Sequence, residues 1–331
     1  MDYASGRHSA SGRHSVSERI HAIRTWWESD DSTPWVAETS GSTGRPKQVL
    51  LSRDAVRAAV AASAERIGAT GGWALAVPPE FVGGFNVIVR SLAAGHQPVI
   101  VDELDFSRVE ADFVSLVPTQ LHRVLEAPDD LRRFHTILVG GGPSDAAVRT
   151  RAREAGLNVV ATYGMAETCG GVVYDGRPLD GVQIRIGDDA RIRISGPTLF
   201  DGYAGIPGSG PDEGWFTTAD AGSFTGGVLS VFGRVDDMVI SGGVKVATTA
   251  VAARLRQHRC VRSAEVLGVS DPEWGQRVVA FVVGEVDLED ARDWVGETLP
   301  RSWAPRQIVP LAQMPLLENG KVDRLALLEL A

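Results

Sequence analysis

Five short apolar runs alternate with helical stretches between residues 73 and 161, and this alternation constrains the fold more than any other feature. The helical stretches lie near residues 84–94, 118–126 and 144–155. Strands alternating with helices predict an α/β fold with a mainly parallel, helix-covered sheet, whose ligands gather beyond the carboxyl ends of the strands. We expect the loops at that edge to line a pocket. The five runs are Trp73–Val77, Pro98–Val101, Phe113–Val117, Thr136–Val139 and Asn158–Ala161.

The pattern changes further along the chain. From Val182 apolar and polar residues alternate and glycine-rich turns follow, which predicts an antiparallel β subdomain. After residue 235 a helical stretch and two strand-like runs predict a small, mobile α+β domain. We therefore expect a disordered polar tail over 1–15, a large domain over 16–235 and a small C-terminal domain over 236–331.

Composition excludes several classes of protein. The net charge of −9 and scattered basic residues argue against nucleic-acid binding. Two cysteines cannot form a disulfide framework, and no apolar run approaches the roughly 20 residues of a membrane span. A cytoplasmic protein without membrane insertion is expected. Monomer and homo-oligomer both remain open.

A loop rich in glycine and hydroxyl side chains follows the strand-like residues 35–37 and ends in a lysine. Glycines let backbone N–H groups approach an anion, hydroxyls donate hydrogen bonds, and lysine adds a positive charge. The spacing differs from a Walker loop, since a strand-like run rather than a helix follows. The sequence predicts a hairpin tip that binds ATP phosphates, with an ordinary polar turn as the alternative. Its expected phosphate-binding residues are Thr39, Ser40, Gly41, Ser42, Thr43, Gly44 and Lys47.

Five separated segments together resemble the adenylate-forming (ANL) ligases, which include acyl-CoA synthetases and peptide-synthetase adenylation domains. The resemblance extends from residue 35 to residue 324. Beside the loop, it rests on Tyr163–Glu167, Gly214–Asp220, Gly233–Met238 with Ser241–Lys245, and Asn319–Arg324.

This resemblance implies ATP, Mg²⁺ and coenzyme A as cofactors and assigns roles to individual residues. Lys321 is implied to be catalytic, because its ammonium can offset the charge that develops as an acyl-adenylate forms. Asp236 is implied to be the hinge between domains and Glu167 the metal ligand. The implied adenine and ribose contacts are Gly141, Tyr163, Gly164, Asp220 and Arg234.

The expected acid pocket is similar to that of menaquinone-pathway ligases that activate o-succinylbenzoate. Arg90 follows Gly84 by six residues and corresponds to an arginine implicated in holding the aromatic carboxylate, as bidentate pairing allows. A helix arginine that extends to solvent is the alternative. The expected pocket residues are Phe81, Gly84, Arg90 and Met165.

Three departures from the family pattern bear on function. Ala166 stands where relatives carry a threonine, and Thr168 is a candidate to replace the lost hydroxyl. Phe81 occupies a position that is His in many relatives, and only about 38 residues precede the phosphate loop. Besides a ligase for o-succinylbenzoate, another acyl-CoA ligase, an adenylation enzyme that loads a carrier protein, or a noncatalytic nucleotide-binding protein remains open.

Overall fold

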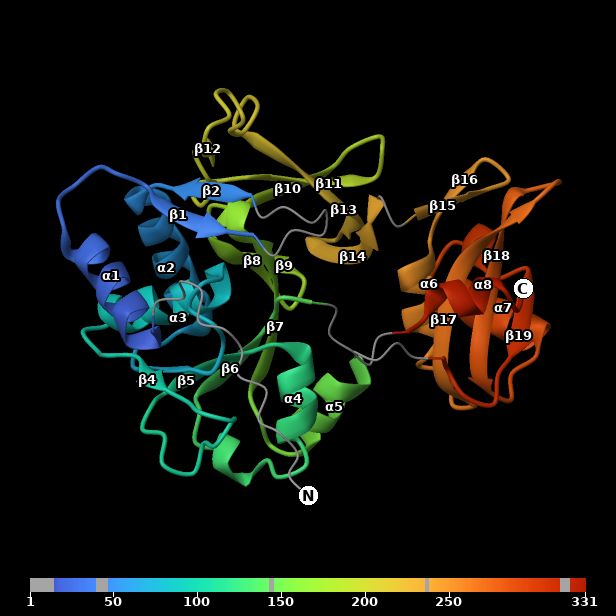
Figure 1. Cartoon of the computed structure of the whole chain (residues 1–331), viewed down its shortest axis with the longest axis horizontal. Helices are drawn as coiled ribbons and strands as arrows, with labels where there is room; N and C mark the ends of the chain where they lie inside the picture. The colour runs from blue at the N-terminus through green and yellow to red at the C-terminus, as the bar shows by residue number, and fades with distance from the viewer. Residues whose placement is uncertain (1–14, 40–46, 143–145, 236–237, 316–321) are drawn as a thin grey trace, which may run out of the picture. The chain divides into compact units, whose positions relative to one another are not determined.

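The computed structural model describes residues 15–39, 47–142, 146–235, 238–315 and 322–331. The chain divides into two compact units, one of residues 1–183 with 195–216 and the other of residues 184–194 with 217–331. Figure 1 labels their helices and strands. Expected site residues outside the described residues are Ser40, Gly41, Ser42, Thr43, Gly44, Asp236 and Lys321.

A seven-stranded sheet in the order β4-β3-β5-β6-β7-β8-β9 is the centre of the first unit (Figure 1). The first five strands in this order pair in parallel, which confirms the predicted parallel sheet. Strands β8 and β9 add an unpredicted antiparallel edge. The bounds are β3 Trp73–Leu75, β4 Val99–Ile100, β5 Phe113–Leu116, β6 Thr136–Val139, β7 Val159–Met165, β8 Gly170–Tyr174 and β9 Arg177–Pro178.

Helices cover both faces of this sheet. Successive side chains of a strand point to opposite faces, so neighbouring residues of one strand pack against different helices. Val114 of β5 belongs to a buried cluster that includes Leu121 of helix α4. Phe113 points the other way and stacks on Trp73, over which the guanidinium of α3 residue Arg90 lies. The helices of this unit are α1 Val16–Glu28, α2 Arg53–Ile67, α3 Val82–Ala93, α4 Pro118–Val124 and α5 Ala146–Glu154, with 3₁₀ turns η1 Asp129–Leu131 and η2 Ala166–Thr168.

Helix α1 is absent from the sequence-based expectations, and its first turn corrects one of them. Ser15, assigned to a disordered tail, caps α1: its hydroxyl accepts from the Glu18 backbone N–H, and the Glu18 carboxylate accepts from the Ser15 backbone N–H. This reciprocal pair satisfies two backbone donors that a helix start leaves unpaired. Ser15 therefore belongs to the start of α1 and not to the expected tail.

A small antiparallel sheet joins the phosphate-loop hairpin to a distant segment. Strands β1 (Trp35–Glu38) and β2 (Gln48–Leu51) form the predicted hairpin, and β12 (Gly202–Tyr203) pairs with the other side of β2. Val49 and Leu51 are fully buried. Residues more than 150 positions apart in sequence are thus held together at the base of the loop.

The second unit contains two sheets. Their strand orders are β10-β11-β13-β14 and β16-β15-β18-β17, with β19 in parallel beside β18. The alternating β pattern predicted from Val182 and the α+β pattern after residue 235 are both confirmed. The bounds are β10 Gln183–Ile186, β11 Arg191–Ser195, β13 Trp215–Thr225, β14 Val228–Arg234, β15 Met238–Ser241, β16 Val244–Ala247, α6 Thr248–Leu255, β17 Val261–Asp271, β18 Gly275–Gly284, α7 Leu288–Gly296, η4 Arg301–Trp303, β19 Gln307–Pro310 and α8 Arg324–Leu328.

The compact units do not follow the domain boundary expected at residue 235. Residues 184–194 and 217–235 group with the C-terminal part of the chain rather than with the parallel sheet. The sequence assigns them to the large domain because the pattern of helix and strand-like runs that predicts the small domain begins only after residue 235. A functional boundary at residue 235 stays a prediction.

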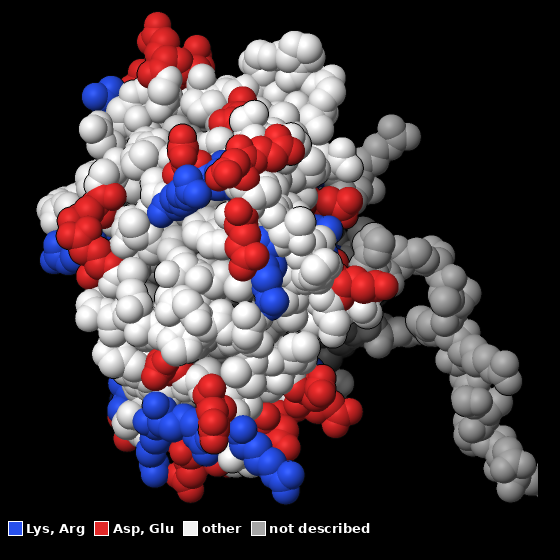
Figure 2. All heavy atoms as spheres, turned by 90° about the vertical axis from the view of Figure 1, so that its left-hand side faces the viewer, with Lys and Arg blue, Asp and Glu red and all other residues white. Residues whose placement is uncertain are grey.

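Charge is dispersed on the surface of the first unit. On the face in Figure 2, charged side chains of the described residues stand in small groups of both signs, without a continuous basic area. Within the described residues, no helix combines the length and apolar character needed to cross a membrane.

Candidate functional site

The base of the phosphate-loop hairpin is closed by two hydrogen bonds. The Thr39 N–H donates to the Lys47 carbonyl over 3.0 Å, and the Lys47 N–H donates to the Thr39 hydroxyl over 3.1 Å. Thr39 directly follows β1 and Lys47 directly precedes β2, so these two residues lie at the ends of the phosphate loop. The backbone of Lys47 is held by both hydrogen bonds, and the residue is exposed to solvent.

Lys47 and the expected metal ligand, Glu167, both contact Tyr203, a residue that sequence reasoning missed. The Lys47 ammonium lies 5.0 Å from the centre of the Tyr203 ring, and the Tyr203 hydroxyl donates to Glu167 Oε1 over 2.8 Å. A cation suited to phosphate and a carboxylate suited to a metal therefore contact the same side chain. An aromatic residue inside a glycine-rich loop is the only signal in the sequence that marks Tyr203.

Glu167 is held in a 3₁₀ turn whose other side chains point inward. The Thr168 hydroxyl accepts from the Met165 N–H over 2.9 Å and lies 2.7 Å from the Gly170 carbonyl oxygen, fully buried. Thr168 therefore does not replace the hydroxyl lost at Ala166. Cys169 follows in a left-handed conformation, and burial raises the pKa of its thiol, which keeps it protonated.

The expected adenine-binding residues lie at one edge of the parallel sheet. Val139, the last residue of β6, pairs with Ala161 of β7, so the loop with Gly141 begins beside the strand that carries Tyr163 and Gly164. Gly141 has φ of +77°, which favours glycine. At Gly164 a Cβ atom would lie 1.9 Å from the Gly170 carbonyl oxygen, so only glycine fits.

The expected acid-pocket residues occupy helix α3 and the end of β7. Arg90 is only 8% exposed, so the alternative of a helix arginine that extends to solvent is wrong. Its guanidinium donates to the Tyr174 hydroxyl over 3.1 Å, while its Nε is buried and has no partner among the residues that the structure describes. In contrast, Phe81 caps α3 and is 43% exposed. Met165, at the end of β7, is half-buried.

Gly84 marks a close approach within this region. A Cβ atom there would lie 2.3 Å from the Pro78 carbonyl oxygen and 2.7 Å from the Pro79 Cα. The loop before α3 is therefore packed directly against the helix backbone. Asn86, one turn before Arg90, donates to the Cys169 carbonyl over 2.8 Å and ties α3 to the Glu167 turn.

The two expected ribose contacts face each other in the second unit. Asp220 and Arg234 are partners in the antiparallel register of β13 and β14, and both are half-buried. Directly opposite residues on one face lie roughly 5 Å apart at their Cβ atoms. The Thr218 hydroxyl accepts from the Asp220 N–H over 3.1 Å, which fixes the backbone that carries the carboxylate.

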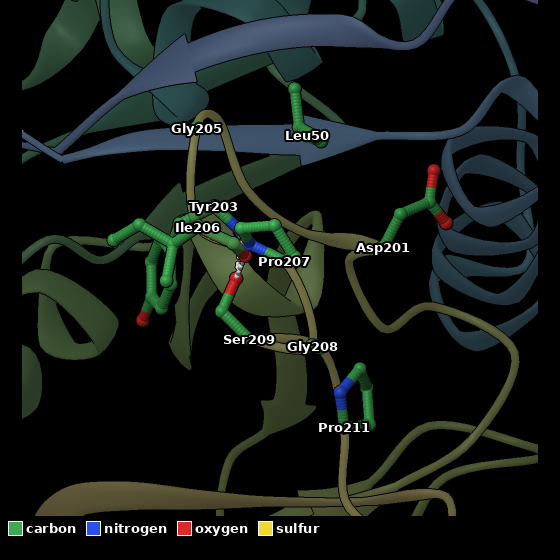
Figure 3. A pocket seen from close by; sticks show the side chains of 11 residues that line it. Leu50, Asp201, Tyr203, Gly205, Ile206, Pro207, Gly208, Ser209 and Pro211 are labelled. Carbon is green, nitrogen blue, oxygen red and sulfur yellow. Dashed lines mark hydrogen bonds between the residues drawn. The ribbon is translucent and has the colours of Figure 1, made fainter.

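A hollow of about 570 Å³ lies along the loop after β12 and shares only Tyr203 with the residues above (Figure 3). In Figure 3 the side chains of Tyr203 and Asp201 point away from each other. Partial burial raises the pKa of the Asp201 carboxyl, against a hydrogen bond from the Ser52 side chain. The chemistry expected from the sequence lies beside this hollow rather than in it.

The candidate metal site rests on a single carboxylate, that of Glu167. Within the described part of the chain, no three His, Cys, Asp or Glu side chains are grouped so that they could hold a metal ion. A single carboxylate such as Glu167 suits Mg²⁺, which is commonly held by one or two carboxylates together with substrate phosphates.

Two family models match the chain: the AMP-binding enzyme over residues 18–204 and the AMP-binding enzyme C-terminal domain over residues 250–321. A probable 2-succinylbenzoate–CoA ligase from Mycobacterium tuberculosis is 40% identical over 93% of this chain and 87% of its own length. The 2-succinylbenzoate–CoA ligase of Enterococcus faecalis is 29% identical over 89% of this chain and 69% of its own.

Solved structures agree with these matches. The o-succinylbenzoate CoA synthetase of Bacillus subtilis, solved with the acyl-adenylate intermediate OSB-AMP, superposes with a TM-score of 0.71. It is 28% identical, and the match covers 88% of this chain and 68% of that one.

Proposed function

This chain belongs to the AMP-binding enzyme family, and from that premise we propose that it is an ATP-dependent 2-succinylbenzoate–CoA ligase of menaquinone biosynthesis. The reaction has two halves. The acid's carboxylate oxygen attacks the α-phosphorus of ATP and pyrophosphate leaves; the thiol of coenzyme A then attacks the acyl carbon and AMP leaves. The contact of Lys47 and Glu167 with the same tyrosine is the observation that carries the adenylating chemistry.

In the first half-reaction the hairpin and the Glu167 turn act on the phosphates. Lys47 supplies positive charge beside the loop of residues 40–46, and its fixed backbone supports a role in binding the β- and γ-phosphates. Glu167 is the proposed Mg²⁺ ligand. The metal, when bound, neutralises phosphate charge as pyrophosphate leaves.

Two groups of residues are proposed to bind the nucleoside. Tyr163 and the backbone near Gly141 and Gly164 would enclose the adenine, and Asp220 would accept from the ribose hydroxyls while Arg234 donates. The adenine-binding residues share one edge of the parallel sheet, and Asp220 and Arg234 are opposite partners in the β13–β14 register, which supports these assignments.

The acid is proposed to bind beside helix α3, with Arg90 holding its aromatic carboxylate. A buried guanidinium whose Nε has no partner can gain a charge-assisted hydrogen bond from such a ligand. Gly84 and Met165 would shape the pocket. Exposed Phe81 would close its outer side.

Lys321 is proposed to stabilise the charge that develops during adenylation. Rotation about Asp236 is then proposed to move Lys321 out of the site and to admit the thiol of coenzyme A. Coenzyme A as the acceptor rests on the relatives named above. Two cysteines without disulfides fit a cytoplasmic protein.

AMP release measured with a panel of carboxylic acids tests this function. We expect 2-succinylbenzoate with coenzyme A to support release, and Lys321→Ala to lose ATP–pyrophosphate exchange nearly completely. Equal activity with benzoate or fatty acids would instead indicate a broader acyl-CoA ligase. Exchange without any thioester formation on free coenzyme A would indicate an enzyme that loads a carrier protein.

A further inference from the structure

The backbone of Tyr203 is fixed to the phosphate-loop hairpin. Tyr203 pairs with Val49 in the β12–β2 register, and the next residue, Ala204, donates to the Gln48 carbonyl over 2.9 Å. On its other side the Tyr203 N–H donates to the Ser209 hydroxyl over 2.8 Å (Figure 3). The tyrosine is therefore held in register with the strand that begins directly after Lys47.

The side chain of Tyr203 reaches from this strand to the Glu167 turn. Its hydroxyl donates to only one carboxylate oxygen, Oε1, over 2.8 Å. The Phe200 N–H also donates to the Glu167 carbonyl, over 3.0 Å, so Phe200 holds the backbone of this residue and Tyr203 holds its side chain. One rotamer of the carboxylate is thereby favoured, and within the described residues Oε2 is left for another ligand.

The Tyr203 ring has a second role toward the hairpin. The Lys47 ammonium lies 5.0 Å from the ring centre, within the range in which an aromatic face attracts a cation. An ordinary phenol is protonated at neutral pH, so the Tyr203 hydroxyl can donate to the Glu167 carboxylate. The hydroxyl and the ring thus act on groups of opposite charge.

We propose that Tyr203 is a positioning residue that orients the Glu167 carboxylate toward Mg²⁺ and the Lys47 ammonium toward the phosphates of ATP. This inference rests on the proposed function for the role of Glu167. Losing the hydroxyl removes the hydrogen bond that orients the Glu167 carboxylate. Outer-shell partners of metal ligands typically contribute about 10- to 100-fold to metal affinity.

Two substitutions of Tyr203 in the full chain separate the hydroxyl from the ring. In Tyr203→Phe we expect the Mg²⁺ concentration for half-maximal AMP formation to rise about tenfold, while the KM for ATP at saturating Mg²⁺ changes little. Tyr203→Leu should add a rise of roughly two- to fivefold in the KM for ATP, because the contact with Lys47 is also lost. Binding of Mn²⁺ in the presence of a nonhydrolysable ATP analogue, followed by electron paramagnetic resonance, should weaken in parallel.

Thr136→Val is the control, because it deletes a buried, hydrogen-bonded hydroxyl of the same unit that lies outside the proposed site. It should lower stability without shifting the Mg²⁺ dependence. An active parent whose Tyr203→Phe variant keeps the same Mg²⁺ half-saturation overturns the inference, as does an equal loss of kcat in both variants without a metal shift. If the parent forms no AMP with any acid, the proposed function fails, and Mn²⁺ binding alone then decides the role of Tyr203.

Discussion

The Arg90 guanidinium donates a hydrogen bond to the Tyr174 hydroxyl over 3.1 Å, and the same hydroxyl lies 2.7 Å from the Ser63 hydroxyl. These three side chains join helices α2 and α3 to strand β8 in the buried interior. Among the described residues, no carboxylate forms an ion pair with Arg90. A buried cation that lacks an anionic partner is costly, so this network is a place where a ligand carboxylate can act.

Replacing Arg90 by methionine should affect acid binding selectively. We expect the KM for 2-succinylbenzoate to rise about 10- to 100-fold, since a hydrogen bond to a charged group contributes about 1.5–3 kcal/mol. The KM for ATP should stay the same. Arg57→Met, on the exposed face of α2, is the control. An unchanged KM for the acid in Arg90→Met would remove Arg90 from the proposed pocket.

Tyr174→Phe should destabilise the first unit. Its hydroxyl is buried and has two partners, and both lose a hydrogen bond when it is removed. Partners left unsatisfied in the interior cost about 1–3 kcal/mol. Denaturant unfolding of the full chain measures this free energy, with Ser63→Ala expected to share part of the loss. A stability equal to that of the parent would show that the network contributes nothing.

Two adjacent glycines of α3 should respond in opposite directions to alanine. Gly84→Ala places a methyl group 2.3 Å from the Pro78 carbonyl oxygen and should cost about 3 kcal/mol, whereas a Cβ at Gly83 meets nothing within 4 Å. Gly83→Ala should be stabilising by about 0.5 kcal/mol, because alanine loses less backbone entropy in a helix. Thermal unfolding of both variants tests this prediction, and similar melting temperatures would contradict it.

Asp201 provides a pH-dependent test. Partial burial raises the pKa of this carboxyl above its unfolded value, so its contribution to stability is present below that unfolded value and is lost as the pH rises through the folded one. Asp201→Asn should therefore melt slightly higher than the parent at pH 7, and the difference should be small because Asp201 is largely exposed to solvent. The difference should disappear below about pH 4. A difference that grows toward acid pH would show the opposite sign.

Much of the fold follows from local sequence signals. Apolar strand runs alternate with helices in the parallel sheet. Ser52 and Gly68, residue types typical of helix ends, bound α2 through an N-cap hydrogen bond and a left-handed C-cap. Helix α1 escapes such reasoning because its cap, Ser15, lies in a Ser-rich segment. The β8–β9 edge escapes it because β7 continues beyond Ala161 to Met165 before the chain reverses.

The candidate site is less accessible from sequence, because its members meet only through tertiary structure. Glycine positions are readable, since Gly141 needs a positive φ and Gly164 a close approach. The contact of Tyr203 with Lys47 and Glu167 depends instead on the pairing of β12 with β2, which no local pattern specifies. Likewise, whether Arg90 extends to solvent or is buried is decided by the packing of α3 over Trp73.

The burial of Arg90 also affects how long the protein persists in the cell. If the acid supplies the missing anion, its binding favours the folded chain by mass action and slows loss of the chain through unfolding. Substrate supply would then set how much enzyme persists as well as how fast it works. Chain half-life in cells with and without the acid measures this, and an equal half-life in both would separate turnover from binding.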